Sequence, residues 1–336
     1  MSGLKTVIAG FGAVARGLAT DAKMAAWFPI ATHAQALKAD SRFDWVGVVD
    51  PDPAARQAAE DDWSVPAFET AAAAAHLAPD ILVLASPPGA RADALRALPG
   101  VRGVLAEKPL GDKDGTALIE EATRCGIPVQ VNYWRRGDAT LNALAHGGLR
   151  DRIGDVQAAT GVYGNGLANN GSHLTDMIRM LLGEPAWVQA IGDAASCRAS
   201  PVPDDIHVAF ALGMASGAAV SVHPLDFRHY REVALDIWGT AGRLAFEQET
   251  LLIRAIPRTA NRGLADEFEI AADRSVSLPC TVAETLPNLY ANLADAVAGG
   301  TALKSSGDSA LKTERIISLI RASAETGGSR LAVEDG

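Results

Sequence analysis

The first fifteen residues constrain the fold of this chain more than any other segment. The apolar run Thr6–Ala9 leads directly into Gly10-Phe11-Gly12-Ala13-Val14-Ala15. A strand, a glycine-rich turn and a helix in this order form the dinucleotide-binding fingerprint, here with alanine as its third small residue. The first glycine permits a sharp turn, the second lets the backbone approach a pyrophosphate, and the alanine allows close helix packing. We expect the phosphates to bind at the positive end of a helix that begins here.

Further apolar strands follow, separated by helical segments. The predicted strands are Asp44–Asp50, Asp80–Ala85, Gly103–Ala106 and Ile127–Val131, and the helices are Pro53–Glu60, Ala90–Leu98 and Lys113–Arg124. This alternation predicts a doubly wound parallel sheet in residues 1–130, a Rossmann domain that binds ligands at the carboxyl ends of its strands. The cofactor-binding candidates there are the first five fingerprint residues and the residues at strand ends, namely Gly10, Phe11, Gly12, Ala13, Val14, Asp50, Ser86, Pro87, Glu107 and Lys108.

Residues 131–336 have a different pattern. Predicted strands follow one another between turn signals, at Val156–Tyr163, Trp187–Gly192, His207–Leu212, Ala218–His223, Val233–Trp238, Leu244–Glu247 and Leu251–Ala255. One helix, Ser172–Leu182, interrupts them, and the helices Thr285–Ala298 and Ser309–Glu325 close the chain. This predicts an α+β domain with a large, mostly antiparallel sheet that is open on one face. An open apolar face would favour a homodimer or homotetramer formed through this sheet.

Composition excludes several classes of protein. Hydrophobic residues make up 48% of 336 residues, which suits two domains with large cores. The net charge of −10 argues against nucleic acid or an anionic membrane as a partner, and there is no long uncharged apolar run. The start of the chain lacks a signal-peptide pattern, and Cys125, Cys197 and Cys280 lack metal-ligand or disulfide-framework spacing. We expect a cytoplasmic protein without a metal site.

The combined motifs resemble the GFO/IDH/MocA family, named for glucose–fructose oxidoreductase and inositol dehydrogenase. The resemblance covers nearly the whole chain. It is carried by the fingerprint, by Glu107-Lys108-Pro109, by the glycine-rich approach to a helix with His173 and Asp176, and by the pattern from Ser306 to Thr313. It implies that Lys108 and His173 flank the substrate carbon and the nicotinamide. It also implies a sugar, polyol or sugar derivative as substrate. Asp50, at the end of the second strand, predicts NAD rather than NADP, because its carboxylate accepts hydrogen bonds from ribose hydroxyls and repels a 2′-phosphate.

The chemistry of hydride transfer supports these two residues as catalytic candidates. Oxidation of an alcohol requires a group that accepts the hydroxyl proton, and reduction requires a group that donates one. Lys108 can serve as that group, or its ammonium can stabilise a developing alkoxide. The alternatives are a surface lysine at a strand end, a first-turn histidine with a local hydrogen bond, and an Asp176 stabilised by the helix dipole. Ser172 is expected to cap this helix.

One position departs from the family. Many members carry aspartate four residues before the histidine, whereas this chain has Asn169. An amide can orient an imidazole but cannot neutralise an imidazolium, so we expect Lys108 to carry more of the proton transfer. Either the substrate class differs, or a carboxylate comes from Asp176 or Asp226. The substrate-binding candidates are Lys108, Tyr163, Asn169, Asn170, His173 and Asp176.

A further segment, Asp21–Ala39, lengthens the gap between the fingerprint and the second strand. It is either a surface loop with one buried aromatic anchor or a flap beside the cofactor. His33, within it, is expected to be structural or exposed, because the remaining histidines have no shared metal-ligand spacing.

The sequence therefore predicts an NAD(P)-dependent oxidoreductase that acts on a sugar-like secondary alcohol or ketone. The alternatives are a lyase or glycosidase that retains its NAD, and an inactive nucleotide-sensing protein.

Overall fold

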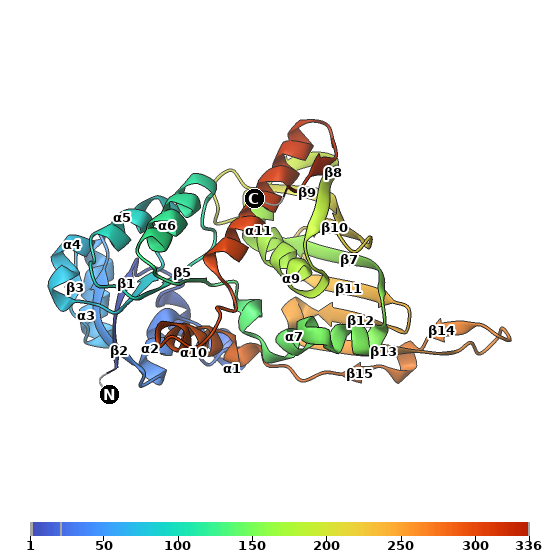
Figure 1. The fold of residues 1–336 in the computed structure, drawn as a ribbon, viewed down its shortest axis with the longest axis horizontal. Coiled ribbons are helices and arrows are strands. Elements are labelled where there is room, and N and C mark those ends of the chain that lie inside the picture. Colours follow the sequence, from blue (N-terminus) through green and yellow to red (C-terminus); the bar gives the residue numbers. More distant parts are fainter. Residues whose placement is uncertain (1–2, 21, 335–336) are drawn as a thin grey trace. The chain divides into compact units, whose positions relative to one another are not determined.

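The computed structural model describes residues 3–20 and 22–334, in two compact units (Figure 1). The first unit consists of Met1–Asp138 and Ala283–Lys312, and the second of Ala139–Val282 and Thr313–Gly336. The late segment in the first unit differs from the expected division at residue 130. Helix α10 (Thr285–Val297) packs its buried Leu289, Tyr290 and Leu293 into the core of the first unit, so the chain returns to this unit after leaving it.

The first unit contains a six-stranded parallel sheet in the order β3-β2-β1-β4-β5-β6, which confirms the predicted Rossmann sheet. The strands are β1 (Leu4–Ala9), β2 (Phe43–Val49), β3 (Ala67–Phe68), β4 (Ile81–Leu84), β5 (Gly103–Ala106) and β6 (Val129–Val131). The strand order reverses direction between β1 and β4, which is where such sheets bind their ligands. The fingerprint turn follows β1 and therefore lies at this point.

Helices cover both faces of this sheet, because neighbouring residues of each strand point to opposite faces. Ile8 of β1 belongs to a core with α2 (His33–Ala39), α3 (Pro53–Trp63) and α10. Val7 belongs to the opposite core with α4 (Ala71–Ala74), α5 (Arg91–Arg96) and α6 (Asp112–Arg124). Strands buried on both faces explain the almost continuous apolar runs of the sequence.

The helix expected directly after the fingerprint is interrupted. Residues Gly12–Arg16 form a turn, a short 3₁₀ helix (Gly17–Thr20) and α1 (Ala22–Trp27) follow, and the helix resumes as α2. The N–H groups of His33 and Ala34 donate to the carbonyls of Val14 and Ala15, at 3.4 and 3.0 Å. The described residues 17–20 and 22–31 thus lie between the fingerprint turn and α2, whose first residues bond back to that turn. Asp21, the first residue of the additional segment Asp21–Ala39 noted in the sequence, lies outside the described residues.

The second unit contains a ten-stranded mixed sheet, which confirms the predicted, mostly antiparallel sheet. Its path is β14-β13-β12-β11-β7-β10-β9-β8-β16, with β15 paired to β13, and β7 and β10 are its parallel pair. The strands are β7 (Val156–Gly164), β8 (Pro185–Ser196), β9 (Ile206–Met214), β10 (Ala219–Leu225), β11 (Ala234–Gly239), β12 (Gly242–Glu247), β13 (Leu252–Ala260), β14 (Phe268–Ile270), β15 (Val276–Ser277) and β16 (Leu331–Ala332). The helices are α7 (Ala139–Ala143), α8 (Leu149–Ile153), α9 (Ser172–Leu182) and the greater part of α11 (Gly307–Glu325).

One face of this sheet packs against α9 and α11 in a single core. The other face is less apolar than the sequence predicts. It carries Thr160 and Ser221, whose hydroxyls lie 3.3 Å apart, and ion pairs of Arg243 with Asp236 and of Arg254 with Glu247. Exposed apolar side chains are instead found on the β13–β14 hairpin that extends from this sheet in Figure 1, at Leu264, Phe268 and Ile270, and on β15 at Val276.

None of the helices within residues 3–20 and 22–334 has the length and apolar character that crossing a membrane requires.

Candidate active site

The fingerprint turn provides a place for a dinucleotide. Gly10 has a φ of +91°, and a Cβ added there would lie 2.4 Å from the backbone nitrogen of Ser86. Glycine is therefore required for the close approach of the turn to the end of β4. A Cβ added at Gly12, in contrast, would meet nothing within 4 Å. The structure itself does not require glycine at position 12, and the open space suits a pyrophosphate close to the backbone. Ala13 and Val14 beside it are exposed.

Asp50 is fixed at the end of β2, against the same turn. Its Oδ2 accepts the N–H of Phe11 at 2.6 Å, and its Oδ1 accepts the N–H of Asp52 at 2.9 Å. Each carboxylate oxygen has a second lone pair, so both can still accept a ribose hydroxyl. Arg56 donates to the carbonyls of Asp50 and Pro51, both at 2.9 Å. The Phe11 side chain is buried against Trp45, so its contribution is structural.

Two buried side-chain oxygen atoms follow β4 and β6, the strands on either side of β5. Ser86 follows β4 and Asn132 follows β6, and within the described residues neither the Ser86 Oγ nor the Asn132 Oδ1 has a hydrogen-bond partner. Buried polar atoms are normally paired, so such atoms indicate a group that binds there. Together with Gly12 and Asp50, they make the carboxyl edge of this sheet fit an NAD molecule. Pro87, beside Ser86, is exposed.

Lys108 follows β5 in a segment that the first unit holds from two sides. The guanidinium of Arg91 donates to the carbonyls of Glu107 and Pro109, and its Nε donates to the carbonyl of Ser86. The carboxylate of Glu107 accepts the Asn132 amide at 2.6 Å and lies 3.0 Å from His33 Nε2. Lys108 itself is half-buried. The backbone of Lys108 is therefore held in place by the hydrogen bonds of its two neighbours, Glu107 and Pro109.

His33 is the residue that sequence reasoning missed. It is completely buried and is bound to Glu107 on one side and to the Tyr290 hydroxyl, at 2.8 Å, on the other. The expectation of a structural or exposed residue did not anticipate this link to the Glu-Lys-Pro segment. The available signal was a histidine at the start of a capped helix, since Thr32 and Gln35 form a capping box.

His173 lies in the first turn of α9, which continues from a π-helical turn over Leu167–Gly171. Ser172 does not cap this helix, contrary to prediction. Its hydroxyl donates to the carbonyls of Ala168 and Asn169, both at 2.8 Å, because the π-helical turn already continues into the helix. The π-helical turn therefore sets the conformation of the backbone that leads into His173.

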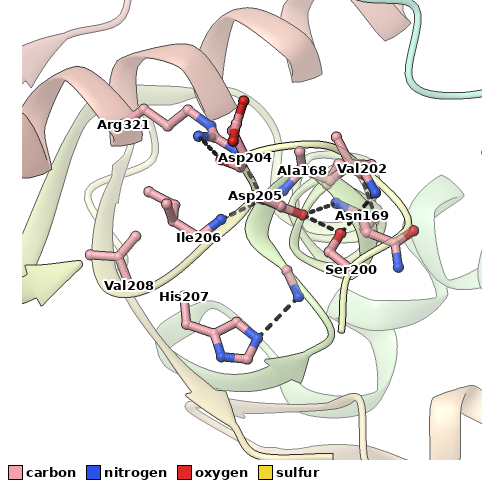
Figure 2. A network of polar contacts seen from close by, with 12 residues as sticks. Ala168, Asn169, Ser200, Val202, Asp204, Asp205, Ile206, His207, Val208 and Arg321 are labelled. Carbon is pink, nitrogen blue, oxygen red and sulfur yellow. Dashed lines mark hydrogen bonds and ion pairs between the residues drawn. The ribbon is translucent and has the colours of Figure 1, made fainter. Parts of the chain in front are cut away.

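Asp205 holds the same turn in place, as Figure 2 shows. Its buried carboxylate accepts the N–H groups of Ala168 and Asn169 at 2.9 and 3.1 Å, the Ser200 hydroxyl at 2.8 Å and the Arg321 guanidinium at 2.9 Å. This residue was also missed, because its partners are distant in sequence. The side chain of Asn169 donates to the carbonyl of Asn165 at 3.1 Å. An aspartate at position 169 would lose this donor and add a carboxylate close to Asp205.

The other substrate-binding candidates differ in their placement. Tyr163 is wrong as a candidate, because it is fully buried and its hydroxyl donates to Val208 O and accepts Val208 N–H. Burial also raises the pKa of this phenol. Asp176 is buried, accepts the Thr313 hydroxyl at 3.0 Å and lies 3.5 Å from Arg179, which favours its structural role. Asn170 has a buried Nδ2 that lacks a hydrogen-bond partner within the described residues, as expected of a ligand-binding amide.

His207 gives this loop a pH dependence that can be measured. Its Nε2 accepts the N–H of Gly166 at 3.0 Å, and burial lowers the pKa of the imidazole, although the charges of Asp205 and Asp226 act in the opposite direction. Below about pH 6.5 the unfolded chain therefore binds more protons than the folded chain. The stabilising contribution should be complete above that pH and fall as the pH drops toward the folded-state pKa. His207→Gln keeps an acceptor that does not titrate, so its melting temperature should fall less between about pH 7.5 and 5.5. Equal falls in both proteins would contradict this prediction.

Comparison with known proteins shows the family of this chain. The family model described as "Oxidoreductase family, NAD-binding Rossmann fold" matches residues 25–133, and the model of the GFO/IDH/MocA C-terminal domain matches residues 144–245. Together these ranges cover more than half of the chain. The protein belongs to the GFO/IDH/MocA family of oxidoreductases.

Solved structures share the fold over its full length. The WlbA dehydrogenase from Bordetella pertussis, in complex with NADH and UDP-GlcNAcA, is 20% identical, with a TM-score of 0.72 over 99% of this chain and 100% of that chain. An oxidoreductase from Agrobacterium radiobacter, in complex with NAD⁺, L-tartaric acid and magnesium, is 17% identical, with a TM-score of 0.72 over 98% of each chain. An oxidoreductase from Pseudomonas syringae is 16% identical, with a TM-score of 0.75 over 99% of each. No curated protein matches the sequence.

Proposed function

We propose that this NAD-dependent oxidoreductase transfers a hydride between the nicotinamide and a secondary alcohol or ketone of a sugar, polyol or sugar derivative. The proposal rests on the Glu107-Lys108-Pro109 segment, which Arg91 holds at the carboxyl edge of the Rossmann sheet. This segment follows β5, two strands away from β1 and its fingerprint turn. The bound UDP-GlcNAcA of one structural relative and the L-tartaric acid of another are polyhydroxylated compounds, which supports this substrate class.

In this proposal Lys108 performs the proton transfer. NAD supplies the hydride acceptor when it is bound. The Lys108 amine takes the proton of the substrate hydroxyl during oxidation, and its ammonium returns a proton during reduction. The positive charge also stabilises an alkoxide that develops on the reacting oxygen. His173 binds and orients the same hydroxyl region, and the amide of Asn170 donates a hydrogen bond to a substrate oxygen.

A thermal-shift screen tests the substrate class. Sugars, polyols, sugar acids and nucleotide sugars are each added to the protein with NAD present, and a true ligand raises the melting temperature by mass action. The compounds that stabilise are then assayed for NADH formation. The proposal fails if the stabilising compounds are consumed without a net change in the redox state of the nucleotide, because such turnover indicates a lyase or glycosidase that retains its NAD.

The position of Asp50 predicts that NAD binds more tightly than NADP. Its carboxylate suits ribose hydroxyls and repels a 2′-phosphate. Arg56 is already engaged with two backbone carbonyls. Calorimetry should give at least about a tenfold preference for NAD. Asp50→Asn keeps an acceptor for the Phe11 N–H but loses the charge, so its preference should be smaller. Tighter binding of NADP by the wild type would reject the assignment.

We propose a homodimer or homotetramer formed through the sheet of the second unit. Exposed apolar side chains at Phe268 and Ile270 on the β13–β14 hairpin and at Val276 on β15 support an interface there. Light scattering at micromolar concentration should give a multiple of the 34.9 kDa chain mass, and Phe268→Ser with Val276→Ser should weaken the association. A monomer mass for the wild type would contradict the proposal.

A further inference from the structure

His33 belongs to a buried chain of hydrogen bonds that no part of the proposed reaction has used so far. The chain runs from the Tyr290 hydroxyl through the His33 ring to the Glu107 carboxylate, and the Asn132 amide binds the same carboxylate oxygen. His33 is completely buried, Tyr290 is completely buried, and Glu107 is 7% exposed. Such a chain, which ends beside a catalytic candidate, indicates a role toward that residue.

The direction of the hydrogen bonds can be assigned from the ends of the chain. Burial and the nearby Glu107 charge raise the pKa of the Tyr290 phenol far above its ordinary value, so the phenol keeps its proton. The Tyr290 O–H therefore donates to His33 Nδ1, and the ring proton lies on Nε2. That N–H donates to the Glu107 carboxylate. Every group of the chain is then satisfied with one neutral imidazole tautomer.

The same bonds keep Glu107 ionised. Burial acts against ionisation, but the hydrogen bond from His33, the amide of Asn132 and the charge of Lys108 outweigh it, and the pKa of Glu107 lies below its ordinary value. A carboxylate next to an amine favours the ammonium form of that amine. The negative charge of Glu107 therefore favours the ammonium form of Lys108.

The backbone of His33 is fixed as well. Its N–H donates to Val14 O of the fingerprint turn, and Thr32 before it accepts the Gln35 N–H in the capping box. Glu107 is held on its other side by Arg91, whose guanidinium is the nearby cation bound to the Glu107 and Pro109 carbonyls. Three segments that are far apart in sequence thus meet at Glu107.

We propose that His33, with its tautomer set by Tyr290, is a positioning residue for Lys108, because it holds the Glu107 carboxylate that fixes the place and charge environment of the lysine. The inference rests on the proposed function, since it concerns the lysine assigned to proton transfer. His33 itself lies behind Glu107 and is not assigned a contact with the substrate.

The titration of Lys108 tests this without any substrate. Lysines are ¹³C-methylated and their resonances followed with pH, and the Lys108 signal is identified by its loss in Lys108→Arg. His33→Leu removes the donor that holds the Glu107 carboxylate in place, so the carboxylate is no longer fixed beside Lys108 and the pKa of Lys108 should fall by about 1. His33→Gln offers a replacement N–H and should largely restore it. Leu37→Ala, a buried change in the same helix, controls for general loosening and should leave the value unchanged.

Tyr290→Phe gives a second variant that keeps the ring in place. Without the phenol, the His33 ring loses the partner that fixes its tautomer, so Nε2 is no longer committed as the donor to Glu107. The carboxylate is then held less firmly beside Lys108, and the pKa of Lys108 should fall here too, by less than in His33→Leu. If His33→Leu does not fold, this variant decides. The proposal is overturned if the Lys108 titration is unchanged in the folded variants, or if Leu37→Ala changes it equally.

Turnover separates this inference from the proposed function. Once a substrate is identified, His33→Leu should lower kcat by about 10-fold to 100-fold with little change in KM, because misplacement of a catalytic group affects the transition state. If Lys108→Ala keeps its activity while the titration responds to His33, the proposed function fails and the coupling stands. If Lys108→Ala is inactive while the titration ignores His33, the positioning role fails alone.

Discussion

Lys108→Ala should reduce turnover at least ~100-fold, the usual scale for the loss of a general acid–base group. The substitution removes both the proton carrier and the positive charge beside the reacting oxygen. The binding of NAD, measured by calorimetry, should change little, because the fingerprint turn and Asp50 are untouched. Steady-state kinetics on the identified substrate checks the prediction.

His173→Ala provides the comparison for this variant. His173 lacks the aspartate that many family members carry at the position of Asn169, so the substitution should weaken substrate binding as much as it lowers turnover. Near-normal turnover of Lys108→Ala, with a large loss of kcat in His173→Ala, would reverse the proposed roles of the two residues.

Gly12→Val should abolish measurable NAD binding while the protein remains folded. An added Cβ at Gly12 meets no protein atom within 4 Å, so the fold tolerates a side chain there. The side chain would fill the space that the pyrophosphate requires. We expect affinity for NAD to fall at least ~100-fold, which corresponds to about 2.7 kcal/mol, with a melting temperature of the free protein close to that of the wild type.

Gly10→Ala is the matched opposite. Its added Cβ would lie within 2.4 Å of backbone atoms, at a φ of +91°. We expect a strongly lowered melting temperature, because the strained backbone alone costs about 1–3 kcal/mol. If Gly12→Val binds NAD normally, or if Gly10→Ala is as stable as the wild type, the turn does not have the role assigned to it.

Strand positions in both units could be predicted from the sequence because local patterns determine them. A run such as Gly103–Ala106 is buried on both faces, and its boundaries agree with β5. Alternation and turn signals gave the strands of the second sheet in the same way. The sequence could not reveal the parallel pairing of β7 with β10, because pairing joins segments that are about sixty residues apart.

The candidate site was predictable only in part, for the same reason. Lys108 and Gly10 belong to short motifs with their own physical signature. Tyr163 has the chemistry of a ligand-binding residue, yet its hydroxyl is used by the backbone of Val208, forty-five positions away. His33 and Asp205 act through distant partners as well. The type of a polar residue determines which hydrogen bonds it can form, but the fold determines which partner it actually binds.

The connection from the fingerprint turn to α2, described at residues 17–20 and 22–31, can change in this enzyme without disturbing its neighbours. The hydrogen bonds from His33 and Ala34 to Val14 and Ala15 already join the start of α2 to the fingerprint turn, so a shorter connection from Arg16 to Thr32 would keep these two parts together. The length of the insertion is also weakly constrained, since each doubling of a flexible loop costs only about 0.6 kcal/mol. Evolution, or a protein engineer, can therefore replace this segment with another module while the nucleotide-binding turn and His33 stay in register.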